Sequence, residues 1–157
     1  MINDKSNNNE KHRLASLHAL NILDTENEPT FDGLVEVAAE VCGVPISLVS
    51  LIDEDRQWFK ANTGLPGTDE TPRDIAFCSH AIEDNNDLLE IKDASADPRF
   101  SQNPLVTGAP DIRFYAGAKL KLSDGSVAGT LCVIDRQPKV LTDICLLYTS
   151  PSPRDRG

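Results

Sequence analysis

The N-terminal part of the chain contains two segments with helical periodicity. From about Glu10 onward, leucines at positions 14, 17 and 20 fall on one face of a helix. A second periodic run begins at Pro29 and ends at Gly43, and these two residue types are typical of the first turn and the end of a helix. We therefore predict two amphipathic helices ahead of the first strand.

Four later segments have the composition of β-strands. Residues 44–52 (VPISLVSLI) are apolar almost throughout, which indicates a central strand covered on both faces. A polar turn separates them from residues 57–63, which we interpret as the returning strand of a hairpin. Residues 112–122 and 127–134 flank the turn sequence Ser-Asp-Gly-Ser and give the clearest hairpin signal in the chain.

The region between the two hairpins is less regular. Its Gly, Pro and Thr content predicts a loop over residues 64–73, after which Asp74 is placed to cap a short helix over residues 77–82. A short strand over residues 88–91 is followed by a long connection over residues 93–110, and connections of that length are often functional in a small domain. Helices packed on an antiparallel sheet predict the α+β class.

Composition is typical of a soluble protein with a single domain. A length of 157 residues gives room for one domain, and 39% hydrophobic residues are enough to form its core. The net charge of −10, without any basic cluster, argues against nucleic acid and against a membrane surface as partners. The polar N-terminus has no apolar run behind a basic start, so we predict no secretory signal and expect a cytoplasmic protein.

The four cysteines, at positions 42, 78, 132 and 145, are far apart, and no pair has C-x-x-C spacing. In a cytoplasmic protein we expect them to be reduced thiols, and neither a zinc cluster nor a dithiol redox motif is predicted. Besides His80, the chain has the histidines His12 and His18, and both fall in the first predicted helix. We therefore predict no metal site and no cofactor.

Residues 145–157 (CLLYTSPSPRDRG) break with the pattern of the preceding chain. They have neither helical nor strand periodicity, and they resemble the in-frame translation of a transposase adapter used in preparing sequencing libraries. We therefore expect three parts. These are a disordered tail over residues 1–11, a domain over residues 12–144 that is truncated at its C-terminal end, and a non-native tail over residues 145–157.

Six sequence blocks, in order, resemble the GAF domain of bacterial sensor histidine kinases and sensor diguanylate cyclases, over about residues 12–140. The blocks are RLASLHALNILDT at 13–25, VPISLVSLIDEDRQWFK at 44–60, ETPRDIAFCSHAI at 70–82, DASADPRFSQNPLV at 93–106, IRFYAGAKL at 112–120 and GTLCVIDRQP at 129–138. The resemblance implies a GAF fold, in which a central antiparallel sheet carries helices on one face. On the other face it implies a ligand pocket roofed by the short helix and the long loops. It also implies a homodimer formed through terminal helices and a covalently linked output domain that is missing from this fragment.

Seven residues are candidates for the pocket that this resemblance implies. They are Arg73, Phe77, Cys78, His80, Arg113, Phe114 and Tyr115. Cys78 and His80 are two positions apart and do not share a helix face, so a catalytic thiol–imidazole pair is disfavoured. For each of these two residues, ordinary packing or hydrogen bonding is the simpler interpretation.

The candidates around residue 113 leave two arrangements open. Because side chains alternate along a strand, either Arg113 with Tyr115, or Phe114, faces the pocket. A guanidinium such as that of Arg73 or Arg113 can hold a carboxylate or phosphate with two hydrogen bonds, but either can instead pair with one of the 25 acidic residues.

We predict a sensory module without catalytic residues that binds an unknown small-molecule ligand and passes a change of state to the output domain. The Asn-Lys-Phe-Asp-Glu signature of the family's cyclic-nucleotide-binding branch is absent, and Ser79 separates the cysteine and histidine that its bilin-binding branch has side by side. Two alternatives remain open. One is a thiol-dependent enzyme of the same fold, such as a free methionine sulfoxide reductase, and the other is a structural dimerisation module with a closed core.

Overall fold

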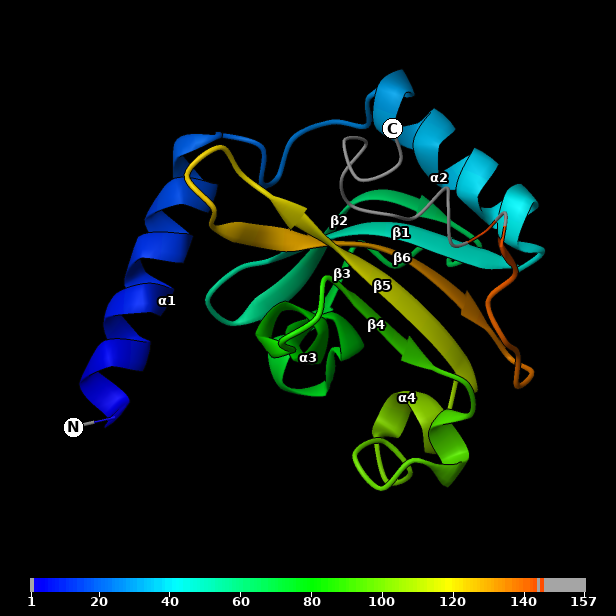
Figure 1. The fold of residues 1–157 in the computed structure, drawn as a ribbon. Coiled ribbons are helices and arrows are strands. Elements are labelled where there is room, and N and C mark those ends of the chain that lie inside the picture. The colour runs from blue at the N-terminus through cyan, green and yellow to red at the C-terminus, as the bar shows by residue number, and fades with distance from the viewer. Residues whose placement is uncertain (1, 144, 146–157) are drawn as a thin grey trace.

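The fold is a six-stranded antiparallel sheet with helices on both faces (Figure 1). The computed structural model describes residues 2–143 and Cys145. In chain order the strands are β1 (Ile46–Ile52), β2 (Arg56–Thr63), β3 (Glu70–Pro72), β4 (Leu88–Ile91), β5 (Phe114–Lys121) and β6 (Val127–Asp135). Across the sheet they follow the order β3-β2-β1-β6-β5-β4. The predicted α+β class is confirmed, and the short strand β3 lies within the segment predicted to be a loop.

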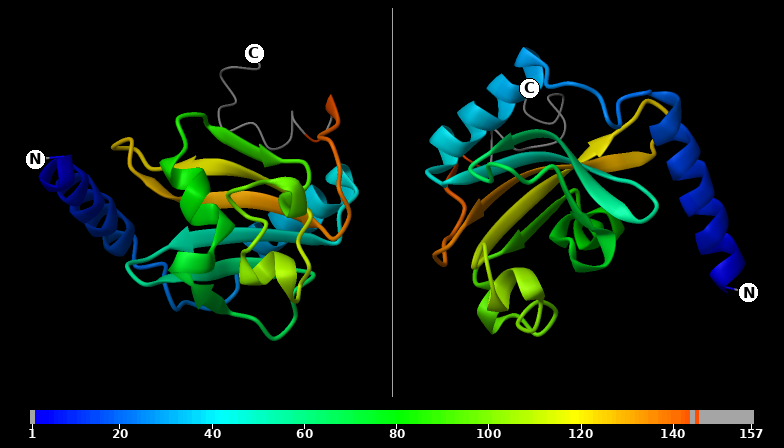
Figure 2. Two further views of the ribbon diagram at one scale, coloured as in Figure 1. Left: turned by 90° about the horizontal axis from the view of Figure 1, so that it is seen from below. Right: turned by 180° about the vertical axis from the view of Figure 1, so that it is seen from behind.

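In the described part of the chain, α-helices lie on both faces and at one end of the sheet (Figure 1). They are α1 (Ile2–Ala19), α2 (Pro29–Cys42), α3 (Phe77–Glu83) and α4 (Pro104–Thr107). In Figure 1, α2 covers one face of the sheet, α3 and α4 cover the opposite face, and α1 runs beside the end of the β5–β6 hairpin. The view from below in Figure 2 shows α3 and α4 crossing the strands on their shared face. None of the helices within residues 2–143 is long and apolar enough to cross a bilayer.

Helix α2 forms where its sequence predicts a helix. Pro29 occupies its first turn, and Gly43 ends it in the left-handed conformation, with φ +66°, that a residue without Cβ adopts at low cost. Its buried face, which includes Val35 and Ala38, packs on Val49 and Phe114 of the sheet. The hydrophobic spacing of the sequence therefore selects the face that the helix buries.

Strand β1 is buried along its whole length, as predicted for a central strand. Leu48 belongs to the apolar cluster under α3, whereas the adjacent Val49 belongs to the cluster under α2. The alternation of side chains along the strand thus supplies both layers of the core. A β-bulge between Val49 and Ser50 interrupts the pairing of β1 with β2.

The N-terminal helix differs from its prediction in two ways. It begins at Ile2, so that residues 2–11, expected to form a disordered tail, are helical. Of the three periodic leucines only Leu17 is fully enclosed, where it packs with Leu51 and Trp58, whereas Leu20 lies just beyond the helix and is 49% exposed. The helix therefore contacts the sheet through its last turns.

The helix cap predicted at Asp74 is wrong. Residues Arg73–Ile75 form a short 3-10 turn, and Ala76 holds the N-cap position of α3 without a side-chain hydrogen bond. Pro72 precedes the 3-10 turn, and Ala76, in extended conformation, separates that turn from α3. Asp74 therefore lies inside the 3-10 turn, too early in the chain to cap α3.

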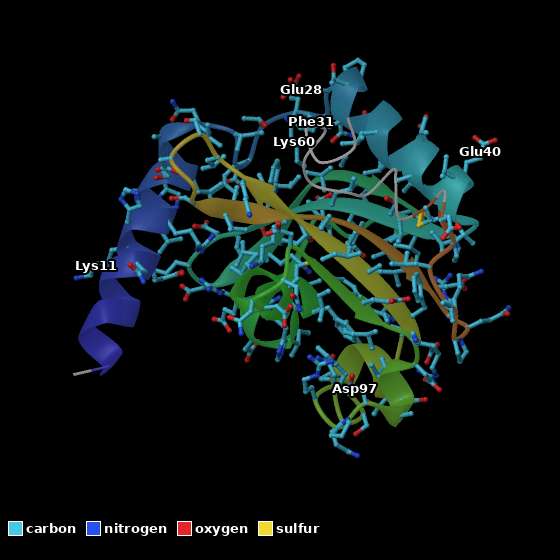
Figure 3. The ribbon with its side chains drawn as sticks, viewed as in Figure 1. Lys11, Glu28, Phe31, Glu40, Lys60 and Asp97 are labelled. Carbon is cyan, nitrogen blue, oxygen red and sulfur yellow. A yellow bond between two sulfur atoms is a disulfide. The ribbon has the colours of Figure 1, made fainter. Side chains whose placement is uncertain are left out.

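The expectation of reduced thiols holds for two cysteines only. Cys42, at the end of α2, forms a disulfide with Cys145, and the Cα atoms of the pair are 4.8 Å apart (Figure 3). Cys78 and Cys132 are free and buried. Sequence spacing failed to find the disulfide because the fold brings together residues separated by 103 positions. Cys145 is the first residue of the segment predicted to be a non-native tail, and residues 146–157 of that segment lie outside the described part.

Candidate ligand-binding cavity

A cavity of about 390 Å³ lies between the sheet and its α3–α4 roof. Its walls are largely apolar, with side chains from β1, β2, β5 and β6 below and from α3 and α4 above. The apolar lining includes Leu48, Phe59, Leu65, Phe77, Leu105, Ile112 and Ile134. Exposed Pro66, Ala109 and Arg136 are also among its lining residues, so the cavity reaches the surface.

Hydrogen bonds to backbone groups hold the roof over the sheet. Asn103 caps α4 by accepting from the Leu105 N–H, and its own amide donates to the Ile75 carbonyl at 3.0 Å, which ties α4 to the turn before α3. Arg113, just before β5, donates to the carbonyls of Val106 and Ile112 at 2.9 and 3.0 Å. The long connection is therefore a braced structure and not a loose loop.

Gln57 is the buried polar group that the lining leaves incompletely paired. Its side-chain amide donates to Thr71 Oγ1 at 2.9 Å, but its Oε1 atom is buried with no hydrogen-bond partner among the described residues. An unpaired buried acceptor costs about 1–3 kcal/mol, which a bound donor group would recover. Sequence reasoning missed this residue, and the only available signal was a single amide between the polar turn and an apolar strand.

A compact polar cluster surrounds Cys78, where α3 in the roof of the cavity meets the sheet. The hydroxyls of Tyr115 and Thr130 donate to Cys78 Sγ at 3.1 and 3.0 Å, and Cys132 Sγ lies 3.9 Å from the same sulfur. Burial raises the pKa of Cys78, but these contacts stabilise its thiolate and together bring the pKa below the ordinary value for cysteine. The contact with Cys78 and burial both raise the pKa of Cys132. Ionisation within this cluster is therefore favoured at Cys78 over Cys132.

Gly117 makes room for the Tyr115 ring. The two residues face the same side of β5, and a Cβ atom at position 117 would stand 2.2 Å from the Tyr115 hydroxyl oxygen. Only glycine leaves that space open. The position of the Tyr115 hydroxyl against Cys78 therefore depends on the absence of a side chain two residues later in the strand.

Of the seven candidate residues, Phe77, Cys78 and Tyr115 line the cavity. Phe114 faces the opposite side of the sheet and packs under α2. Of the two arrangements predicted for β5, the structure therefore has the one in which Tyr115, and not Phe114, faces the cavity. Arg113 is outside the lining and braces α4 instead.

His80 is exposed, and its ring meets Phe100 edge-on, with ring centroids 4.8 Å apart. Cys78, two residues earlier, is buried against the sheet. The prediction that these two side chains do not share a helix face is confirmed. Within the described ranges, no three residues of the His, Cys, Asp or Glu types cluster in a way that suits a metal ion.

Arg73 holds α1 instead of a ligand. Its guanidinium donates to the Glu10 carboxylate at 2.6 Å and to the Asp53 carbonyl at 3.0 Å. Partial burial raises the pKa of Glu10, but hydrogen bonds from Arg13 and Arg73 outweigh that effect and lower the pKa to about 2. This ion pair connects the turn before α3 to the N-terminal helix.

A buried lysine fixes the segment between α1 and α2. The side chain of Lys60 is fully buried, and its Nζ donates to Thr25 Oγ1 and to the Glu26 carbonyl, both at 2.7 Å, and meets Glu28 Oε2 at 2.5 Å. Figure 3 shows Lys60 close to Glu28 and Phe31 at the start of α2. Three oxygen partners compensate for the loss of water around this cation.

The GAF domain family model matches residues 26–148. Because this match covers most of the chain, the chain belongs to the GAF domain family. The resemblance inferred from the six sequence blocks is confirmed at the level of the family. The sheet, the α2 layer on one face and the roofed cavity on the other are the parts of that fold described above.

One curated relative is a cyclic di-GMP phosphodiesterase of Pseudomonas aeruginosa. It is 42% identical over 130 residues, which are 83% of this chain and 22% of that protein. The chain therefore spans about a fifth of the length of this relative.

Solved structures show the same fold at low sequence identity. The GAF domain of a phosphoenolpyruvate-protein phosphotransferase from Coxiella burnetii matches with a TM-score of 0.61 at 14% identity, over 89% of this chain and 85% of that one. A type II free methionine-R-sulfoxide reductase from Thermoplasma acidophilum matches with a TM-score of 0.61 at 12% identity, over 77% and 82% of the two chains.

Proposed function

We propose that the chain is a sensory GAF module that binds a compact, largely apolar small molecule in the cavity under α3 and α4. The observation that carries this proposal is Gln57 Oε1, a buried acceptor without a partner among the described residues in a largely apolar lining. A ligand with an N–H or O–H group would satisfy that acceptor. The cavity volume of about 390 Å³ falls in the range of small-molecule sites.

The rim adds a second element of specificity. Arg136 is exposed at the edge of the cavity, and its guanidinium favours a carboxylate or another anionic group. The proposed ligand class is therefore an apolar body with a hydrogen-bond donor at one end and a negative charge at the other. Aromatic acids that carry an O–H or N–H group on the ring, tyrosine and tryptophan among them, have this chemistry.

We also propose that the output domain of the whole protein acts on cyclic di-GMP. The support is the 42% identity to a cyclic di-GMP phosphodiesterase, of which this chain corresponds to a minor part. A histidine kinase or diguanylate cyclase output, which the sequence blocks also resemble, is the competing outcome. Sequencing the source DNA past codon 144 by a method without transposase adapters distinguishes these outputs and tests the non-native tail.

Dimerisation through the terminal helices is a further part of this proposal. Helix α1 packs on the sheet through Leu17, near its C-terminal end, so we propose that its other turns make the dimer contact. Light scattering of the chain, with and without residues 1–11, measures the mass in solution. A monomer in both cases would contradict a dimer formed through α1.

Thermal shift against a panel of amino acids and aromatic acids tests the ligand proposal. A ligand at 100 times its dissociation constant stabilises the native state by about 2.7 kcal/mol. We expect Gln57→Leu to abolish the shift and Gln102→Leu, at an exposed position outside the lining, to retain it. A shift that survives Gln57→Leu contradicts the assigned role of Gln57, and no shift with any compound of the panel contradicts the proposed ligand class.

The thiol-dependent enzyme is the second candidate function, because Cys78 lines the cavity with Cys132 beside it. Turnover of free methionine sulfoxide with a thiol reductant tests it directly. Multiple turnovers that are lost in Cys78→Ala would establish the enzyme, whereas their absence favours the sensor. The cavity itself argues against a module with a closed core.

A further inference from the structure

Cys78 and Cys132 bring two free thiols together from different layers of the fold. Cys78 lies on α3, in the roof of the cavity, and Cys132 lies on β6, in the sheet beneath it. Their sulfur atoms are 3.9 Å apart, and both side chains are buried, with exposed fractions of 2% and 0%. Because Cys78 is part of the cavity lining, the cavity gives a small molecule a path to this residue.

The surroundings of Cys78 favour its thiolate over its thiol. Two hydroxyls, from Tyr115 and Thr130, donate to the same sulfur at 3.1 and 3.0 Å. Hydrogen bonds to an ionised group are about twice as strong as those between neutral groups. An inert buried cysteine has apolar neighbours instead, and the thiolate is the form that reacts with electrophiles.

We propose that Cys78 and Cys132 form a peroxide-oxidised dithiol site, in which Cys78 reacts first and Cys132 completes a disulfide between α3 and β6. This inference goes beyond the ligand-sensing function and does not depend on it, because it requires only that a molecule the size of hydrogen peroxide enters the cavity.

The reaction balances in two steps. The Cys78 thiolate attacks one oxygen of the peroxide, the O–O bond breaks, and the sulfur becomes a sulfenic acid while the other oxygen leaves as water or an alcohol after taking up a proton. The Cys132 thiol then attacks that sulfur, the S–O bond breaks, and the oxygen leaves as water with the thiol proton. Both sulfurs are oxidised by one electron each, and the peroxide is reduced by two.

The disulfide would change the shape of the cavity. The two sulfurs must approach from 3.9 Å to about 2.0 Å, the length of an S–S bond. Since Cys132 belongs to a strand paired on both sides, α3 is the element that moves toward the sheet. This movement shifts the Phe77 wall of the cavity and removes the thiolate that Tyr115 and Thr130 stabilise.

Peptide mapping of the native chain after treatment with hydrogen peroxide tests the site. Trypsin places Cys78 in a peptide of residues 74–92 and Cys132 in a peptide of residues 122–136, so their disulfide gives one linked species distinct from the Cys42–Cys145 pair. We expect this species to form at the expense of both free peptides and to disappear on reduction. Peroxide-treated protein in which both peptides stay reduced while the native fold is retained overturns the proposal.

Two variants separate the roles of the thiols. In Cys132→Ala, we expect dimedone to trap a sulfenic acid at Cys78, whereas in Cys78→Ala residue Cys132 should remain reduced. In Tyr115→Phe, loss of one hydrogen bond to the thiolate should slow oxidation about tenfold. Equal oxidation rates for the native chain and Tyr115→Phe would contradict the role of Tyr115 in stabilising the Cys78 thiolate. Sulfenic acid at Cys132 instead of Cys78 would overturn the assigned order of reaction. Peptide mapping of the native chain still decides on the disulfide where a variant does not fold.

Discussion

Replacing Gly117 with alanine should expel the Tyr115 ring from its place in the core. The added Cβ would lie 2.2 Å from the Tyr115 hydroxyl oxygen and 2.7 Å from the ring carbon that bears it. Such contacts are too short to persist, so the buried Tyr115 ring must give way toward the cavity that it lines. The ring must therefore rotate away from Cys78.

The expected free-energy changes can be estimated from these contacts. Overpacking in a close-packed core costs about 1–3 kcal/mol, which sets the effect of Gly117→Ala. Tyr115→Phe removes the hydrogen bond to Cys78 and should cost about 1 kcal/mol. Because phenylalanine also removes the nearest clashing atom, the double variant should be more stable than the sum of the two changes predicts, by about 1 kcal/mol.

Urea unfolding followed by fluorescence of Trp58, the single tryptophan, measures all three variants. Gly33→Ala is the matched control, because its Cβ would meet no atom within 4 Å and it lies inside α2. There alanine should stabilise the protein by about 0.5–1 kcal/mol. If Gly117→Ala and Tyr115→Phe are additive within about 0.5 kcal/mol, Gly117 does not serve to accommodate Tyr115.

Three further changes test other parts of the structure. The pKa of Glu10 is lowered from 4.5 to about 2 in the folded protein, so its contribution is present above pH 4.5 and is lost as pH falls toward 2. After allowance for solvent screening, Glu10→Gln should cost about 1 kcal/mol at pH 7 and nothing near pH 2, as measured by urea unfolding at both values; equal costs would contradict the ion pair. Lys60→Met should lower the free energy of unfolding by about 1–3 kcal/mol, because three oxygen atoms lose a buried donor, whereas Lys11→Met at an exposed position should have little effect. Thiol titration of the unfolded, unreduced chain should find two of the four cysteines, and four titrating thiols would show that Cys42 and Cys145 are not joined.

The sequence was sufficient to predict the elements whose burial is periodic or continuous. Helix α2 and strand β1 lie where hydrophobic spacing predicted them. The buried residues of α2, and most of those of β1, are the hydrophobic ones in the sequence pattern, so the pattern alone identifies each element. The start of α1 was missed because its first residues are polar and carry no hydrophobic period. The short strand β3 was missed because three residues between turn-forming types give no pattern at all.

The site was only partly accessible to the same reasoning. Alternation along β5 predicts that Phe114 and Tyr115 face opposite sides, but only the packing of α2 and α3 decides which side each one faces. The partners of Arg73 and Arg113 are a carboxylate on another helix and two backbone carbonyls, which charge counting cannot identify. The polar neighbours of Cys78 come from two different strands, so that no local motif records them.

The ion pair between Arg73 and Glu10 gives the cavity roof a direct mechanical link to the N-terminal helix. Arg73 lies in the turn that leads into α3, and Glu10 lies about two and a half turns before the C-terminal end of α1. A displacement of α3 that moves Arg73 also moves Glu10. Because α1 is held on the sheet at Leu17, well away from Glu10, such a displacement would tilt α1 about that contact. In the proposed sensor, the angle of the outer helix would then report what the cavity contains while the sheet remains rigid.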